Sequence, residues 1–355
     1  MTIRPSMLLG LALSLAGACS STGSLTDGGP GGAAGGGQSG AGGSGGGGTG
    51  GAATTPTTEL SGIAYGNGTF VAAGIDLQNP LLWTGVIYAS ADGATWTKVA
   101  SGLSGETHDV KFGNGKFVAV ASNISDSGVY PATAFVSDDG QTWTMTRELP
   151  ERMVAQRIAF GAGSFVTAGM QSHVRSTDGV TWAAFGPAAA SYLASEVDFA
   201  AGHFVSWTLG ATSVAVYDGN AWSTGALPDT QYKLADVRVV NDSLVAITRY
   251  DCCVGEQPDA IRWGTASSAD GSSWAATQTG LFERPPQIVH ESGTLCIAIR
   301  DFDVLSGDSC NSLAVTFHDG TFRPEAALHA GGVFVVSGMG GLLSSTDGRV
   351  WTKRL

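Results

Sequence analysis

The 355-residue sequence predicts an all-β protein built from repeated antiparallel hairpins. Three observations support this prediction. A Ser-x-Asp-Gly-x-x-Trp motif recurs along the chain, a second motif with a Gly-containing turn between apolar runs precedes each copy of it, and no segment has a sustained helical period. We therefore expect strands and tight turns from residue 59 to residue 355.

The first motif is clearest as STDGVTW, which begins at Ser176. Its Asp can accept hydrogen bonds from the backbone of its own turn, its Gly can take a positive φ, and its Trp can pack a large apolar face on a neighbouring strand. Two copies are weaker, because one lacks the Ser and the other has Arg323 at the Trp position. The motif aspartates are Asp92, Asp139, Asp178, Asp218, Asp270, Asp319 and Asp347.

The second motif reads IAYGNGTFVAAG from Ile63, VKFGNGKFVAV from Val110 and IAFGAGSFV from Ile158, and weaker copies begin at Val197, Val237, Ile288 and Ala327. A short turn of the Asn-Gly kind between two apolar runs is typical of a tight hairpin. Two hairpins make a four-stranded sheet, and repeats of roughly 40–50 residues have the length of propeller blades. The prediction is a seven-bladed β-propeller of four-stranded antiparallel blades over residues 59–355.

The Asp-Gly motifs resemble Asp-box, or BNR, repeats, which occur as S-x-D-G-x-x-W in sialidases and many other propellers. The resemblance implies that the seven aspartates are structural and lie on the face away from any active site. A sialidase also needs an arginine triad, an acid and a Tyr-Glu pair, and that set is not recognisable here. The early F/Y-R-I-P motif is missing from the first repeat, and Phe322-Arg323-Pro324 falls inside a weak Asp-Gly motif.

Long segments between the second and third strands indicate where a ligand would bind. They are expected at 75–85, 123–131, 249–264 and 300–312, on the face opposite the Asp-Gly turns. Arginine, carboxylate and aromatic groups in the last two segments could recognise a sugar or a carboxylate. Alternatively, they pair with one another on a solvated surface. The candidate ligand-binding residues are Arg249, Tyr250, Asp251, Arg262, Trp263, Arg300, Asp301 and Asp303.

These features favour a binding module for a glycan, a peptide or a protein over an enzyme. The alternatives are a sialidase-like glycoside hydrolase that uses Arg and acidic residues of the same two segments, and an assembly or scaffold factor for envelope proteins. No catalytic residue can be assigned. The six His residues are scattered and no Cys-x-x-Cys occurs, so we expect no metal site and no cofactor. We expect a monomer.

The N-terminus predicts export. Residues 1–18 have the charge, apolar run and small-residue ending of a signal peptide. Because Ala16-Gly17-Ala18 is followed by Cys19, the segment resembles a bacterial lipoprotein signal with its lipobox, although Leu15 stands four places before the cysteine instead of three. An ordinary secretory cut at the same bond is the alternative. Residues 20–58 then form a Gly/Ser-rich tether.

We therefore expect a domain organisation of a signal peptide at 1–18, a lipidated Cys19 with its tether at 19–58, and the propeller at 59–355. The predicted location is the outer membrane or the cell surface of a bacterium. A net charge of −12 argues against nucleic acid and anionic headgroups as partners, so the membrane is contacted through the lipid only.

Five cysteines in an exported chain leave one unpaired, which a lipidated Cys19 would explain. The other four fall in the fifth and sixth repeats. In an oxidising compartment we expect a disulfide from Cys252 or Cys253 to Cys310, with a vicinal Cys252–Cys253 bridge as the alternative. Cys296 stands between apolar neighbours and is expected to be a buried thiol.

Overall fold

The computed structural model describes residues 57–78, 83–122, 124–125, 128–129, 132–149, 155–169, 172–186, 196–251, 261–281 and 283–355. They all belong to one compact unit, Thr55–Leu355. All regular structure in this part of the chain is β, which confirms the all-β part of the prediction. Cys19, the predicted signal peptide, nearly all of the predicted tether, and the pair Cys252 and Cys253 lie outside the described residues.

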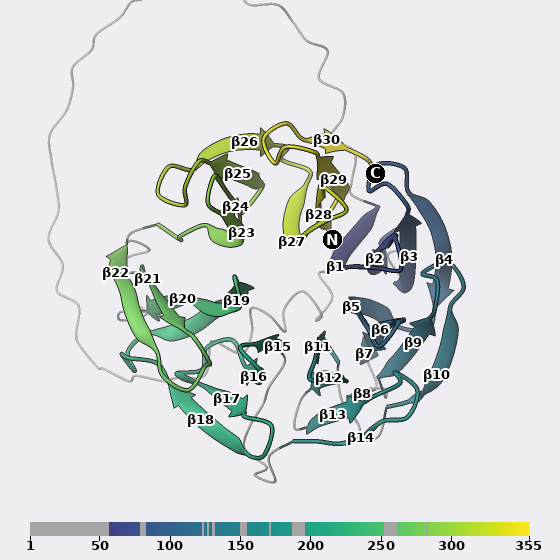
Figure 1. The fold of residues 1–355 in the computed structure, drawn as a ribbon, viewed down its shortest axis with the longest axis horizontal. Helices are drawn as coiled ribbons and strands as arrows, with labels where there is room; N and C mark the ends of the chain where they lie inside the picture. The colour runs from purple at the N-terminus through teal and green to yellow at the C-terminus, as the bar shows by residue number, and fades with distance from the viewer. Residues whose placement is uncertain are drawn as a thin grey trace, which may run out of the picture. The chain divides into compact units, whose positions relative to one another are not determined.

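The sheets of this unit stand in a ring, and the first strand of each lies nearest the centre (Figure 1). Five sheets are four-stranded blades, each named below by its first strand. The β5 blade contains β5 (Glu106–Gly113), β6 (Lys116–Ser122), β9 (Thr133–Ser137) and β10 (Thr144–Glu148). The β11 blade contains β11 (Arg157–Gly161), β12 (Ser164–Gly169), β13 (Ser172–Ser176) and β14 (Ala183–Ala184). A separate two-stranded ribbon pairs β7 (Ile124–Ser125) with β8 (Gly128–Val129).

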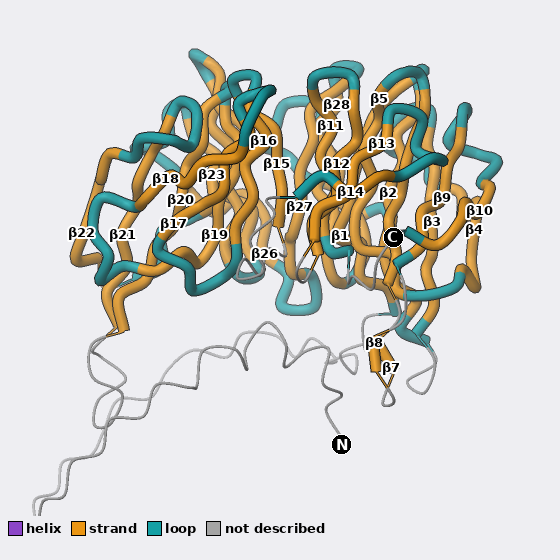
Figure 2. The backbone as a smooth tube through the Cα atoms, turned by 90° about the horizontal axis from the view of Figure 1, so that it is seen from below, coloured by secondary structure: helices purple, strands orange, loops and turns teal. Residues whose placement is uncertain are grey.

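The other three blades follow in chain order, and Figure 2 shows the ring from the side, with strands joined by loops at both ends. The β15 blade contains β15 (Glu196–Ala200), β16 (His203–Trp207), β17 (Ser213–Tyr217) and β18 (Trp222–Ala226). The β19 blade contains β19 (Lys233–Val240), β20 (Ser243–Asp251), β21 (Ile261–Ser268) and β22 (Ala275–Leu281). The β23 blade contains β23 (Gln287–Ser292), β24 (Leu295–Arg300), β25 (Asp303–Gly307) and β26 (Ala314–His318).

The first and last repeats do not form separate blades, because their strands share one eight-stranded sheet. It contains β1 (Thr58–Gly66), β2 (Thr69–Asp76), β3 (Thr84–Ser90), β4 (Thr97–Leu103), β27 (Arg323–Ala330), β28 (Val333–Met339), β29 (Gly341–Ser345) and β30 (Thr352–Lys353). Glu59 of β1 pairs with Met339 of β28, and Gly340 N–H donates to the Thr58 carbonyl at 2.9 Å. The prediction of seven four-stranded blades is therefore wrong. The bond satisfies the N–H of Gly340, which lies between β28 and β29, and the carbonyl of Thr58 at the start of β1.

The tight hairpins between first and second strands are confirmed. Asn67 and Gly68 have φ values of 48° and 75°, as a type I′ turn requires, and Asn114 with Gly115 repeats this geometry. The Asn67 amide donates to the carbonyl of Asp138 at 2.9 Å, in the β9–β10 turn of the next blade. The first hairpin turn and the Asp-Gly turns therefore share one face of the ring, and the Asn side chains join adjacent sheets there.

Each strong Asp-Gly motif closes the turn between third and fourth strands. Asp178 accepts hydrogen bonds from Val180 N–H at 2.8 Å and Thr181 N–H at 2.7 Å. These bonds lower the pKa of Asp178 to about 2, with Thr181 contributing most. Trp182 Nε1–H donates to the Gly179 carbonyl at 3.0 Å. Asp92, Asp139, Asp270 and Asp347 hold similar turns.

The two weak motifs behave differently from the strong ones. Asp218 keeps its bonds from Asn220 and Ala221 N–H, but Trp222 Nε1–H donates to the Phe185 carbonyl of the preceding blade. Asp319 lies in the connection between β26 and β27, where its carboxylate accepts from Thr321 and Lys353. It therefore does not occupy the turn between third and fourth strands.

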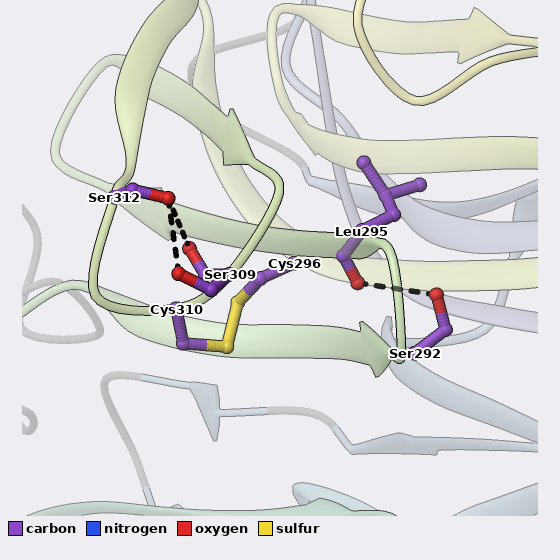
Figure 3. Close-up of a disulfide and its surroundings, with 6 residues drawn as sticks. All are labelled: Ser292, Leu295, Cys296, Ser309, Cys310 and Ser312. Atoms are coloured by element: carbon purple, nitrogen blue, oxygen red, sulfur yellow. Dashed lines mark hydrogen bonds between the residues drawn. A yellow bond between two sulfur atoms is a disulfide. The ribbon is translucent and has the colours of Figure 1, made fainter.

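The disulfide in the β23 blade joins Cys296 to Cys310, so Cys296 is not a free thiol and the expected bridge to Cys310 from Cys252 or Cys253 is wrong (Figure 3). The physical reason is the short β24–β25 turn, which contains only Asp301 and Phe302. Cys296 pairs with Gly307 across these strands, so the chain brings Cys310 back beside Cys296. The longer segment of this repeat therefore lies between β25 and β26, and not between its second and third strands as expected.

Candidate functional site

A cavity of about 150 Å³ lies at the centre of the ring, and we call it the channel cavity. Its lining residues lie in the first strands of the repeats and at the end of β16. These first strands are β1, β5, β11, β15, β19, β23 and β27. The polar and charged side chains that line it are Ser61, Asp109, Lys111, Arg157, Glu196, Asp198, Trp207, Asp236 and Arg238. Apolar residues such as Ile63 and Val289 complete the wall.

The charged groups enter the cavity because of their positions in the first strands. In four consecutive repeats a charged residue directly precedes the apolar residue that opens the strand's run, in the steps Asp109-Val110, Arg157-Ile158, Glu196-Val197 and Asp236-Val237. A second charged residue follows two positions later at Lys111, Asp198 and Arg238. Side chains at i and i+2 lie on one face of a strand, so both sets point the same way. This spacing of charged residues is the sequence signal for the cavity, and it lies in the first strands and not in the long loops.

Three ion pairs neutralise most of these charges, and each is only partly exposed. The pairs are Lys111 Nζ with Asp109 Oδ1 at 3.4 Å, Arg157 Nε with Glu196 Oε2 at 2.9 Å, and Arg238 Nε with Asp236 Oδ2 at 3.4 Å. Arg238 Nη2 also donates to the Glu325 carbonyl at 3.2 Å. Because one partner of each pair has a side-chain exposure of 20% or less, salt screens these pairs less than it screens pairs between fully exposed side chains.

Asp109 and Arg157 connect neighbouring blades. Asp109 is 2% exposed and accepts hydrogen bonds from Val110 N–H at 2.8 Å and from Ile158 N–H, in the next blade, at 3.2 Å. Burial opposes the charge of Arg157, but Glu196 and Asp109 nevertheless hold its pKa above the ordinary value. Arg157 Nη1 also donates to the Ser61 carbonyl across the channel at 3.3 Å. The wall is therefore fixed before any ligand arrives.

Asp198 and Trp207 differ from the other polar groups of the cavity. Within the described part of the chain, Asp198 has no cation within 4.0 Å, and its carboxylate accepts from Phe199 N–H at 2.8 Å. Burial raises the pKa of Asp198, and Lys111 lowers it by less. Trp207 is 3% exposed, and its indole Nε1–H has no hydrogen-bond acceptor among the described residues.

A second group of charges surrounds Glu59. Burial and the negative charge of Glu325 raise the pKa of Glu59 to about 7, although Arg323 opposes this rise. Arg323 Nη2 donates to Glu325 Oε1 at 2.7 Å, and Glu106 adds a further negative charge. These residues lie near the starts of β1, β5 and β27, just before the positions of those strands that line the channel cavity.

The candidate residues predicted from loops form two groups, and neither lines the channel cavity. The first group lies at the end of the β20–β21 hairpin where residues 252–260 connect the two strands, and there Arg249 pairs with Trp263, Tyr250 with Arg262 and Asp251 with Ile261. Here Arg284 lies over the Trp263 ring at 5.9 Å. The hairpin register explains why these residues meet one another.

The second group lies at the β24–β25 turn of the next blade. Arg300 Nη1 is 3.8 Å from Glu283 Oε2, and His318 Nδ1 is 2.6 Å from Asp303 Oδ1. Asp301 sits in the turn with a φ of 51°. Arg300 and Asp303 therefore have charged partners from outside the candidate set, and Arg249, Arg262 and Arg300 do not line the channel cavity.

Comparisons with known proteins identify the fold and no more. No family model matches the chain, and no curated protein matches it. A solved structure of YCF48 bound to D1 peptide is similar over 81% of this chain and 91% of its own, at a TM-score of 0.59 and 13% identity. A catalytically inactive virginiamycin B lyase from Staphylococcus aureus with quinupristin is similar over 82% and 95%, at 0.59 and 10%.

The β-propeller domain of the Trilobed protease from Pyrococcus furiosus is also similar, over 84% of this chain and 98% of its own, at a TM-score of 0.50 and 6% identity. The ring of antiparallel sheets and these likenesses agree that the chain has a β-propeller fold. Among the residues that the structure describes, no group of three or more His, Cys, Asp or Glu could hold a metal ion. That part of the chain also holds no helix able to cross a membrane.

Proposed function

We propose that this chain is a non-enzymatic binding module that recognises a peptide segment of a partner at the channel cavity. The observation that supports this most is a pre-formed cavity whose wall combines ion pairs, an unpaired carboxylate and a free indole N–H. Preformed concave sites with a few converging polar groups are typical of ligand binding. The YCF48 structure, which holds a peptide on a similar ring, supports a peptide over a glycan.

The hydrolase alternative has less support. A sialidase-like site would need Arg249, Arg262 and Arg300 to converge in a pocket, but none of the three lines the channel cavity. Each cation of the channel cavity is already paired with a carboxylate. Arg157 and Arg238, the two arginines that line the cavity, are therefore already bound to carboxylates of the protein and not available to bind a substrate carboxylate.

We also propose that the module works outside the cytoplasm, tethered by a lipid on Cys19. The support is the signal-like segment 1–18 and the Gly/Ser-rich stretch that follows. A disulfide between Cys296 and Cys310 fits an oxidising compartment. A tethered module of this kind would hold a partner's segment near the membrane, and capturing folded envelope proteins instead would favour the scaffold alternative.

The test compares two lysines of the same blade. The immobilised chain is exposed to a random decapeptide pool, and the retained peptides are counted for wild type, Lys111→Met and Lys116→Met. The two lysines have the same side-chain exposure, 35%, but Lys111 lines the cavity while Lys116 pairs with Asp138 near an Asp-Gly turn. We expect Lys111→Met to change retention by about tenfold, which corresponds to about 1.4 kcal/mol, because it leaves Asp109 in the cavity wall without its cation.

Lys116→Met should leave retention unchanged. Failure of the wild type to retain any peptide would overturn the proposed function, and so would equal retention by the two variants. Release of cleaved products from a glycan or peptide substrate would replace the binding module with the hydrolase alternative.

A further inference from the structure

The side chains that line the channel cavity include one more carboxylate than cations. Four carboxylates and three cations line it, so its formal net charge is −1. The three cations are matched one to one with Asp109, Glu196 and Asp236 at 2.9–3.4 Å. Asp198 is the carboxylate that these pairs leave over. Asp198 is half-buried, and burial raises its pKa although Lys111 and Arg238 oppose the rise, so a cation bound beside it would stabilise its charged form.

The same wall carries an unsatisfied donor. Trp207 is one of the residues that line the cavity, it is 3% exposed, and its Nε1–H has no acceptor in the described part of the protein. Buried indole N–H groups normally find a partner. A ligand that places an oxygen here would satisfy the indole, while a bare alkylammonium chain would not.

The two groups stand close enough for one small ligand to reach both. Glu196 pairs with Trp207 and Asp198 pairs with Val205, so Asp198 and Trp207 are diagonal neighbours on one face of the β15–β16 hairpin. Diagonal neighbours of this kind have β-carbons about 7 Å apart. A ligand with an ammonium group and an acceptor separated by two or three bonds fits that spacing.

We propose that the channel cavity recognises a primary ammonium group with a carbonyl oxygen beside it, as at the free amino terminus of a peptide. The ammonium pairs with Asp198, and the first carbonyl accepts from Trp207 Nε1–H. This inference rests on the proposed function, because it names the part of the peptide that enters the cavity.

The size and chemistry of the cavity favour this end of a chain. A volume of 150 Å³ equals about five water molecules at ~30 Å³ each, which suits one terminal residue better than a folded segment. An internal peptide segment offers carbonyls but no cation. A lysine side chain offers the ammonium without a carbonyl beside it, so it would leave Trp207 Nε1–H unsatisfied.

The first experiment measures retention of two random decapeptide pools on the immobilised chain, one with free and one with acetylated amino termini. Both pools are made with and without lysine. We expect the free pools to be retained about tenfold more than the acetylated pools, regardless of lysine content. Equal retention of free and acetylated pools would overturn the inference and leave the proposed function standing. Retention that follows lysine content would also overturn it, in favour of a side-chain ammonium.

The second experiment removes each contact separately. Asp198→Asn removes the charge at constant size, and Trp207→Phe removes the N–H while keeping an aromatic ring. Each should lower retention of the free pools toward that of the acetylated pools, whereas Asp138→Asn, an exposed aspartate in an Asp-Gly turn, should not. Circular dichroism confirms that each variant is folded. Unchanged preference for free termini in both folded variants would overturn the inference, and retention of neither pool by wild type would overturn the proposed function as well.

Discussion

At single residues, the propeller depends on glycines that let one sheet approach the next. Gly179, in the strongest Asp-Gly motif, has a φ of 74°, and a Cβ added there would lie 2.5 Å from Val118 Cγ2 of the neighbouring blade. Gly163 of the same blade has a similar φ of 70° but nothing within 4 Å of an added Cβ. The two positions therefore separate backbone strain from steric overlap.

We predict that Gly179→Ala destabilises the protein more than Gly163→Ala. Both variants incur about 1–2 kcal/mol for a left-handed backbone conformation, and Gly179→Ala adds about 1–3 kcal/mol of overpacking against Val118. Denaturant unfolding followed by tryptophan fluorescence measures the difference. Equal losses would mean that the two blades can separate at this point without cost.

The ionised side chain of Asp198 should destabilise the folded protein, although it provides the proposed contact with the ligand's ammonium group. Burial raises the pKa of Asp198, so ionisation of this side chain destabilises the folded state. The protonated form stabilises the folded state at low pH, and this stabilisation is lost as pH rises through the raised pKa. We predict that Asp198→Asn stabilises the apo protein at pH 7 by about 0.5–2 kcal/mol, as replacements of strained functional groups often do. Thermal unfolding at a series of pH values from 7 downward checks this, because the gain should shrink as pH falls toward the ordinary aspartate value of 3.8. A loss of stability at pH 7 would show that the carboxylate is compensated.

At the scale of elements, strand β1 joins the first repeat to the last, because its residue Glu59 pairs with Met339 of β28. Glu59 has a folded-state pKa of about 7 against an ordinary value of 4.5. A raised carboxyl pKa means that the folded protein prefers the protonated form. Its contribution is complete below about pH 4.5 and is lost as pH rises through about 7.

We predict that Glu59→Gln flattens the stability profile of the protein between pH 4.5 and 7. The wild type should lose up to about 3 kcal/mol over this range from Glu59, since each pKa unit corresponds to about 1.4 kcal/mol. Urea unfolding at several pH values measures the slope, with exposed Glu291→Gln as the matched control. The same slope in wild type and Glu59→Gln would contradict the assignment.

The elements differ in how far the sequence determines them. The Asn67-Gly68 and Asn114-Gly115 hairpins could be predicted, because a type I′ turn needs these residue types at adjacent positions. The β24–β25 turn could not, because Asp301 takes a φ of 51° without a neighbouring glycine. The error in this turn also produced the wrong disulfide, since the position of Cys310 depends on where the chain reverses.

At the scale of the molecule, the repeated motifs predicted the all-β propeller but not its sheet count. That count depends on one backbone pairing, Glu59 with Met339, and backbone groups are the same in every sequence. The channel cavity was missed for a related reason. Asp198 and Trp207 look like ordinary strand residues until closure of the ring brings the first strands together, whereas the loops at 249–264 and 300–312 stood out only by composition and length.

The last prediction concerns the whole chain and its anchor. If Cys19 carries a lipid, Cys19→Ala should move the exported protein from the membrane fraction to the soluble fraction, because a Gly/Ser-rich tether has no membrane affinity of its own. Ser20→Ala is the control and should stay in the membrane fraction. Both variants should keep the Cys296–Cys310 disulfide, shown by a mobility shift only after reduction, since their propellers are unaltered. A Cys19→Ala protein that stays with the membrane would contradict the lipid anchor, and a wild type that is soluble would point to an ordinary secretory cut.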